Sequence, residues 1–131
     1  DRVFNALESS GANRFTMAEN LRRVHKAGGT VVVATDAGNP LTLHGPSIYN
    51  EMEAMQAAGI SAGDIVVMAT RNGARAMRRE GDFGTLEQGK IADLLVLAED
   101  PRANVRAFRS LTHVMRGGRL YRQQELAQRS P

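Results

Sequence analysis

Residues 30–39 read Thr30-Val31-Val32-Val33-Ala34-Thr35-Asp36-Ala37-Gly38-Asn39, an apolar β-branched run that stops at a carboxylate and a glycine loop. The run is short and does not alternate between polar and apolar residues, so we expect a strand buried on both faces, as in a parallel sheet. Ligands of parallel sheets and barrels sit just beyond the carboxyl ends of the strands, which is the place of Asp36. Its carboxylate could ligate a metal, act as a base or orient a hydroxyl. Capping of an ordinary turn is the competing interpretation.

Length and composition indicate a soluble globular protein. The chain has 131 residues, enough to bury a core, with 42% hydrophobic and 24% charged residues. The longest apolar run is too short to span a bilayer, and no signal-peptide pattern opens the chain. The sequence contains no cysteine, which excludes disulfides, thiolate metal sites and a cysteine nucleophile. We therefore expect a cytoplasmic protein without a membrane partner.

The net charge of the chain is positive, but the sequence contains many acidic as well as basic residues. The net charge is +3, and the 17 basic residues are all arginine except Lys26 and Lys90. A nucleic-acid partner would favour basic side chains on one face with aromatic residues between them. Aromatic residues make up only 5% of the chain, and acids are interspersed among the arginines. We therefore expect no nucleic-acid partner.

Capping patterns and glycines divide the first part of the chain into helices. The stretch Thr16-Met17-Ala18-Glu19 is a capping box that predicts a helix start, and Gly28-Gly29 predicts the end of that helix. Further helix starts are predicted at Ser47, Ser61 and Thr70. Gly59 is expected to end the first of these helices, and the last is expected to run to about residue 79.

The sequence changes character at Gly81-Asp82-Phe83-Gly84, beyond which short strands are expected. One is predicted at Ile91–Leu97 and is closed by Asp100-Pro101. Two short apolar runs on either side of Gly117-Gly118 predict a hairpin. The polar tail from Gln123 to Pro131 predicts no more than a helical turn.

Several motifs, each weak alone, follow one another along the chain. They are Ala34-Thr35-Asp36-Ala37-Gly38; Leu43-His44-Gly45-Pro46-Ser47; Ala57-Ala58-Gly59-Ile60; Ala69-Thr70-Arg71-Asn72-Gly73-Ala74; Gly84-Thr85-Leu86-Glu87-Gln88-Gly89-Lys90-Ile91-Ala92-Asp93-Leu94; and Val114-Met115-Arg116-Gly117-Gly118. In their order and spacing they resemble the C-terminal part of the amidohydrolase superfamily. The resemblance is to imidazolonepropionase-like and prolidase-like metal-dependent hydrolases, and it covers about residues 14 to 122.

The resemblance implies an α/β fold, in which a (β/α)8 TIM barrel carries a small β-sandwich. Residues 30–35 would form the eighth and last barrel strand. We therefore expect residues 1–81 to be the C-terminal βα units of such a barrel, with the last strand and its flanking helices. Residues 82–131 are expected to contribute strands to the sandwich, followed by the polar tail.

The resemblance also implies roles for individual residues. In the family, the aspartate after the last strand binds a divalent metal, expected to be zinc. It accepts a proton from the metal-bound water and passes it to the leaving amine. This role falls on Asp36. His44 would lie in the substrate-side loop, although a surface histidine bonded to its own loop is equally compatible with its position. His25 and His113 are expected to be structural or exposed, and Asp93 to be a turn or packing residue.

Most of the metal ligands that the resemblance implies have no counterpart in this sequence. The family needs a His-x-His pair after the first strand, a lysine or glutamate after the fourth, and histidines after the fifth and sixth. Asp36, even with His44, would hold a metal only weakly. We therefore expect a fragment of an amidohydrolase for non-peptide C–N or dipeptide-like amide bonds, inactive alone. A chain that opens on Asp1 rather than methionine fits an excised piece.

Three alternatives concern partners and function. The chain could associate with the missing N-terminal barrel half, or with further copies of itself that cover its unpaired edges. It could also be a non-catalytic oligomeric interaction module, a remnant that retains the fold. A nucleotide-binding α/β domain is disfavoured, because Asp36 would repel phosphate and no Gly-x-Gly-x-x-Gly pattern or Walker lysine follows it.

Overall fold

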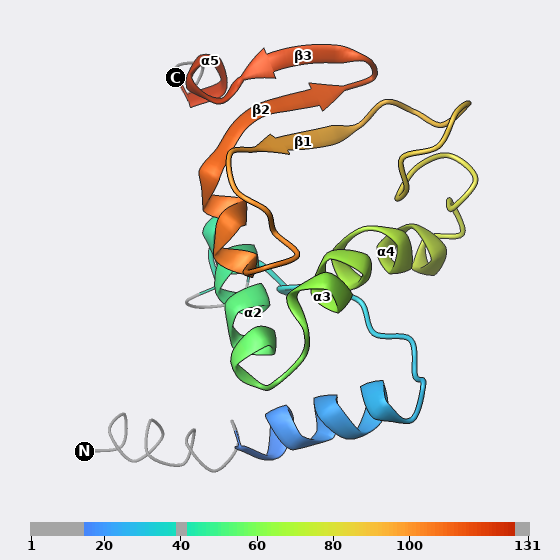
Figure 1. Ribbon diagram of the computed structural model, residues 1–131, viewed down its shortest axis with the longest axis vertical. Coiled ribbons are helices and arrows are strands. Elements are labelled where there is room, and N and C mark those ends of the chain that lie inside the picture. Colours follow the sequence, from blue (N-terminus) through green and yellow to red (C-terminus); the bar gives the residue numbers. More distant parts are fainter. Residues whose placement is uncertain (1–14, 39–41, 128–131) are drawn as a thin grey trace.

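The computed structural model describes residues 15–38 and 42–127. Helices occupy the first part of this range and a small sheet the second (Figure 1). Residues 15–26 are helical. The further elements are α2 (Pro46–Ala57), α3 (Ala62–Ala69), α4 (Arg71–Ala76), β1 (Leu94–Leu97), the 3-10 helix η1 (Val105–Ser110), β2 (Leu111–Arg116), β3 (Arg119–Arg122) and α5 (Gln123–Ala127). In the figure, the sheet and α5 lie at one end of the molecule, the helix over 15–26 at the other, and α2 to α4 between them.

The hydrophobic core lies where α2, α3 and η1 meet. Apolar residues three apart on each α-helix fall on one face of that helix, which is the reason these helices pack together. Ile65 is fully buried and Val105 is 2% exposed. The buried core cluster consists of Met52, Met55, Ile60, Ala62, Ile65, Met68 and Val105. The part of the chain that carries the small sheet thus reaches the helical core through η1, an element that the sequence pattern did not predict.

The strand predicted over residues 30–35 is not formed in the described structure. The segment runs as a connection from the helix over 15–26 to the loop before α2, without pairing to a strand (Figure 1). Val31 and Val33 are half-buried against the core, whereas Val32 is 36% exposed. The prediction of a strand buried on both faces is therefore wrong for the chain as described. A β-strand exists through hydrogen bonds to neighbouring strands, and none of the described segments supplies a ladder partner here.

Glycine ends the first helix as predicted, but the predicted capping box is wrong. Gly28 adopts a left-handed φ of 79°, and the Gly29 N–H donates to the Val24 carbonyl at 2.9 Å, as in a Schellman motif. Thr16 cannot be the N-cap, because Phe15 before it is already helical. The Glu19 carboxylate is bound by arginines of its own helix instead.

The helix α2 begins one residue before the predicted cap. Its first residue is Pro46, preceded by Gly45 at φ 85°, and no side chain caps it. Proline suits the first helical position because its missing N–H would have no partner there, so the prediction of Ser47 as the cap is wrong. The predicted end at Gly59 is confirmed, since the Ile60 N–H donates to the Met55 carbonyl at 3.2 Å.

The next two helices start where the sequence predicts, but only the first of them has the predicted side-chain cap. The Ser61 hydroxyl caps α3 by accepting a hydrogen bond from the Asp64 N–H at 3.1 Å. Thr70 precedes α4, although its hydroxyl donates back to the Val66 carbonyl rather than capping the helix. α4 ends at Ala76, earlier than predicted, because Arg78 takes a left-handed φ of 55°.

The sheet is antiparallel throughout, in the order β1-β2-β3. Arg116 pairs with Arg119 across Gly117-Gly118, whose φ values of 55° and 79° are typical of a two-residue type I′ hairpin. The predicted hairpin is therefore confirmed. The strand predicted from Ile91 begins later, at Leu94. The helical turn expected in the tail is α5, and the end of that tail lies outside the described residues.

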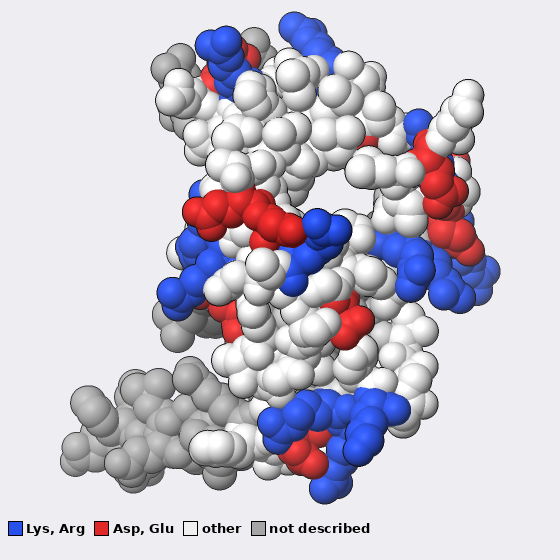
Figure 2. All heavy atoms as spheres, viewed as in Figure 1, with Lys and Arg blue, Asp and Glu red and all other residues white. Residues whose placement is uncertain are grey.

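Polar contacts join η1 to α2. The Val105 N–H donates to the Gln56 side-chain oxygen at 3.0 Å. The Glu53 carboxylate forms ion pairs with the Nε of Arg109 at 2.7 Å and with the Nε of Arg106 at 3.6 Å. Acidic and basic side chains are interspersed over the face shown in Figure 2, rather than separated by sign.

Candidate functional site

Asp36 stands at the end of the segment that the sequence singled out, in an unusual backbone conformation. It is exposed, and its φ of 49° lies in the left-handed region. Among the described non-glycine residues, only Arg78 shares this feature. Aspartate tolerates the left-handed region better than most residues, and such conformations gather at functional sites. The backbone at Asp36 is therefore a reason to treat it as a candidate site residue.

Two hydrogen bonds fix the segment that carries Asp36. The Asn72 side-chain NH2 donates to the Val31 carbonyl at 2.9 Å. The Val33 N–H donates to the Met68 carbonyl at 3.3 Å. Both bonds come from α3 and α4, so these helices set the course of the segment. Sequence reasoning missed Asn72 as a positioning residue, although its place in the Ala69–Ala74 motif was a signal for it.

His44 belongs to the loop that follows Asp36. It is exposed and lies in the turn immediately before α2. The Gly38 N–H donates to the Thr42 carbonyl at 3.2 Å and so draws the two arms of this loop together. Residues 39–41, between those arms, lie outside the described part of the chain. Asp36 and His44 thus share one loop, as the sequence suggested.

The other two histidines occupy different places. His25 lies on the first helix, with its Nε2 3.4 Å from the Asp64 carboxylate on α3. His113 lies on β2, with its Nδ1 3.1 Å from the hydroxyl of Thr112. Each therefore has a local polar partner of its own. Neither belongs to the loop of Asp36.

The described residues do not by themselves fit a complete metal centre. A catalytic zinc site takes three protein ligands and keeps one position open. Within residues 15–38 and 42–127, no group of three or more histidine, aspartate or glutamate side chains is placed to hold an ion. The chain offers the Asp36 carboxylate from this loop, and the remaining ligands of such a site would have to come from elsewhere.

Asp93 has a structural role. Its carboxylate accepts a hydrogen bond from the backbone N–H of Gly117 at 2.6 Å. The prediction that Asp93 is a turn or packing residue is therefore confirmed. The motif that ends in Ala92-Asp93-Leu94 serves the sheet.

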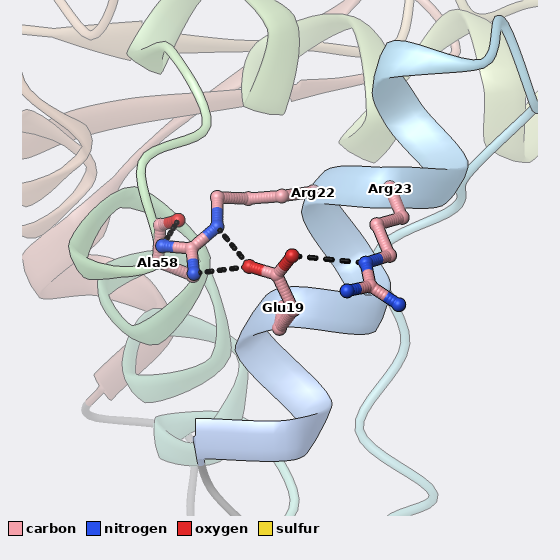
Figure 3. A network of polar contacts seen from close by, with 4 residues as sticks. All are labelled: Glu19, Arg22, Arg23 and Ala58. Carbon is pink, nitrogen blue, oxygen red and sulfur yellow. Dashed lines mark hydrogen bonds and ion pairs between the residues drawn. The ribbon is translucent and has the colours of Figure 1, made fainter.

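A polar network fixes the first helix to α2 (Figure 3). The Glu19 carboxylate accepts hydrogen bonds from the guanidinium groups of Arg22 at 2.6 Å and Arg23 at 2.9 Å. Arg22 also donates to the Ala58 carbonyl at 3.2 Å, near the end of α2. The hydrogen bonds from Arg22 and then Arg23 hold the pKa of Glu19 below its ordinary value. Arg22 is thus the member of the network that joins two elements.

Comparison with known proteins identifies the family. The sequence profile of the Amidohydrolase family matches residues 8–121. An imidazolonepropionase of Syntrophobacter fumaroxidans is 41% identical over 78 residues, which are 58% of this chain and 18% of that protein. Ochratoxinase of Aspergillus niger is 28% identical over 101 residues, which are 74% of this chain and 20% of that protein.

Solved structures agree with the sequence comparison. A putative prolidase from Bifidobacterium longum superposes with a TM-score of 0.73 at 32% identity, over 80% of this chain and 26% of that one. The chain therefore spans between 18% and 26% of the length of these relatives. None of the described helices is long and apolar enough to cross a membrane. With its family profile matched over most of its length, the chain belongs to the amidohydrolase family, a family of hydrolases.

Proposed function

We propose that the chain is the C-terminal piece of a metal-dependent amidohydrolase for non-peptide C–N or dipeptide-like amide bonds. Residues 1–81 would supply the last barrel strand with its flanking helices, and residues 82–131 would supply strands of the β-sandwich. The similarity to an imidazolonepropionase and to a putative prolidase supports this substrate class. The observation that carries the proposal is the placement of Asp36, at the end of a segment anchored by Asn72.

Asp36 is the proposed catalytic carboxylate of the complete enzyme. A carboxylate at this position can accept a proton during attack on the amide and return it to the leaving amine. His44 would line the same loop on the side of the substrate. Asp36 would also be one ligand of a divalent metal, proposed to be zinc, whose other ligands lie outside the described residues.

The chain alone is proposed to be inactive and to associate with a partner. Residues 30–35 have the composition of a barrel strand but no ladder partner among the described residues. Large apolar side chains are also exposed, including Phe15 at 82% and Leu43 at 66%. Either the missing N-terminal barrel half or further copies of this chain would cover them. We propose a cytoplasmic location, because the sequence contains no cysteine and so uses no disulfides.

A chimera tests the catalytic proposal directly. This chain would replace the matching segment of the Bifidobacterium longum protein, and dipeptide hydrolysis and metal content would be measured. We expect hydrolysis by the chimera and a loss of roughly 100-fold or more with Asp36→Asn, since proton transfer by a placed side chain contributes that much. Glu99→Gln is the matched control, because it removes an exposed carboxylate close to the sheet and should leave the rate unchanged.

The isolated chain supplies the second half of this test. We expect neither hydrolysis nor stoichiometric zinc when it is assayed alone, and hydrolysis after mixing with the remainder of the barrel. Equal rates for the chimera and its Asp36→Asn variant would overturn the role of Asp36. A stable oligomer without hydrolysis in any of these mixtures would instead favour the non-catalytic interaction module, which the exposed apolar side chains also suit.

A further inference from the structure

A polar cleft lies at the start of the segment whose end carries Asp36. It has a volume of about 250 Å³ and lies between the end of the first helix, residues 28–30, and the helices α3 and α4. Thr30 lines it, and Thr30 opens the segment that closes with Asp36. The polar lining consists of His25, Thr30, Asp64, Arg71, Asn72 and Arg75. The cleft is therefore separate from the loop of the proposed catalytic carboxylate.

Two arginines give the cleft an excess of positive charge. Arg71 and Arg75 are one turn apart on α4, so both guanidinium groups project from the same face of the helix. Neither makes an ion pair with another described residue, whereas Arg22 and Arg23 share Glu19. Like charges at this spacing disfavour the helix, and an anion between them would remove that repulsion.

The acid that lines the cleft is already engaged elsewhere. The Asp64 carboxylate accepts a hydrogen bond from the Ser61 hydroxyl at 2.6 Å and lies 3.4 Å from the His25 Nε2. The Asp64 carboxylate thus contacts His25 and the Ser61 cap of α3, and no ion pair joins it to the arginines of α4 among the described residues. The two guanidinium groups remain available to a ligand.

The remaining donors suit an oxyanion. Thr30 is exposed, and its backbone N–H makes no hydrogen bond to a backbone carbonyl among the described residues. Its hydroxyl can donate or accept. A single guanidinium can bind phosphate through two parallel N–H···O bonds, which are among the strongest hydrogen bonds in proteins. A cavity volume of about 250 Å³ is well above the roughly 10–15 Å³ that a cavity needs to hold one water, so the cleft has room for an oxyanion.

We propose that this cleft is a binding site for a phosphate group, with Arg71 and Arg75 as its main ligands and Thr30 as a third donor. The bound group belongs to a small phosphorylated molecule or is free phosphate. The site uses none of the residues in the loop that carries Asp36, although Thr30 belongs to the proposed barrel strand.

Calorimetry with inorganic phosphate tests the site on the chain as it stands, at constant ionic strength with chloride as the background anion. We expect saturable binding that falls about tenfold or more with Arg71→Gln and again with Arg75→Gln, because each removes a charge-assisted pair. Arg116→Gln is the matched control, since Arg116 is an exposed arginine of β2 outside the cleft, and it should leave the affinity unchanged. Circular dichroism of each variant verifies folding.

Backbone NMR locates the bound ion. Phosphate should shift the amide signals of Gly29, Thr30 and Arg71, and Thr30→Val should weaken binding without changing the fold. Tighter binding of methyl phosphate than of inorganic phosphate would identify a phosphate ester as the ligand class, and equal binding would identify the free ion. No saturable binding, or equal binding by the Arg71→Gln/Arg75→Gln variant, would overturn the proposal.

Discussion

The Asp93 carboxylate accepts a hydrogen bond of 2.6 Å from the backbone N–H of Gly117, a residue 24 positions later in the chain. The next N–H of the same turn, that of Gly118, donates to the Ala92 carbonyl at 3.0 Å. Ala92 and Asp93, the two residues before β1, therefore accept hydrogen bonds from both glycine N–H groups of the β2–β3 hairpin. This contact links the two motifs Ala92-Asp93 and Gly117-Gly118 into one structural unit.

Removal of this carboxylate should destabilise the sheet. We expect Asp93→Ala to lower the free energy of unfolding by about 1–2 kcal/mol, because the turn loses a hydrogen bond to a charged acceptor. Glu99→Ala is the control, since Glu99 is an exposed acid at the other end of β1 and should change the value little. Urea unfolding followed by circular dichroism measures both. Equal midpoints for the two variants would contradict this role of Asp93.

Substitutions at Gly84 and Gly89 distinguish the cost of a steric contact from the cost of backbone strain. The φ values of the two glycines are similar, 97° at Gly84 and 91° at Gly89. A Cβ added to Gly84 would lie 2.6 Å from the Cβ of Ala74. A Cβ added to Gly89 would meet no atom within 4 Å. We expect Gly89→Ala to cost about 1 kcal/mol, the strain of a left-handed residue. Gly84→Ala should cost about 1–3 kcal/mol more, because the contact with α4 is overpacked. Thermal unfolding of the two variants, compared with the unchanged chain, measures this difference.

Arg78 occupies a position that favours glycine. It follows α4 with a φ of 55°, and the Arg79 N–H donates to the Ala74 carbonyl at 2.9 Å, as in a Schellman motif. We expect Arg78→Gly to raise the free energy of unfolding by about 1 kcal/mol, since the left-handed strain disappears. Arg75→Gly, inside the same helix, should lower it by about 1 kcal/mol. The same sign for both substitutions in urea unfolding would contradict this explanation.

Local signals explain which parts of the fold were predictable. The end of α2 at Gly59 and the cap of α3 at Ser61 depend on a few consecutive residues, so the sequence predicts them. The start of α2 was misplaced because Pro46 and Ser47 both favour a helix start, and proline occupies the first turn. The hairpin at Gly117-Gly118 is equally local, since the turn type requires left-handed residues.

Contacts between distant residues explain what was missed. The helix η1 depends on the bond from Val105 to Gln56, 49 positions away, and the cap at Asn104 is a weak local signal beside it. Residues 30–35 have the composition of a strand, but a strand requires neighbours that the described chain does not supply. The role of Asp36 stays a prediction, because the described residues hold no group of three or more side chains that could bind a metal ion.

The ion pair of Asp100 gives a prediction for pH. The Arg102 guanidinium and backbone N–H lower the pKa of Asp100 from 3.8 to about 2. A carboxyl with a lowered pKa stabilises the folded state above its unfolded pKa of about 4, and this contribution is lost as the pH falls towards 2. We expect Arg102→Gln to return the pKa towards 3.8, as measured by carboxyl 13C NMR. Arg106→Gln should leave it unchanged, because Arg106 pairs with Glu53.

Asn72 gives the sharpest test of how the candidate site is held. Its side chain donates to the Val31 carbonyl, and Val33 bonds to Met68 on the same segment. We expect Asn72→Ala to speed hydrogen exchange at the Val33 amide about tenfold, because loss of a partly buried hydrogen bond worth about 1 kcal/mol or more lets the segment open locally. Asn104→Ala removes the cap of η1 and should leave this amide protected, although it lowers overall stability. Unchanged exchange at Val33 in the Asn72 variant would show that packing of the segment alone determines the course of the chain towards Asp36.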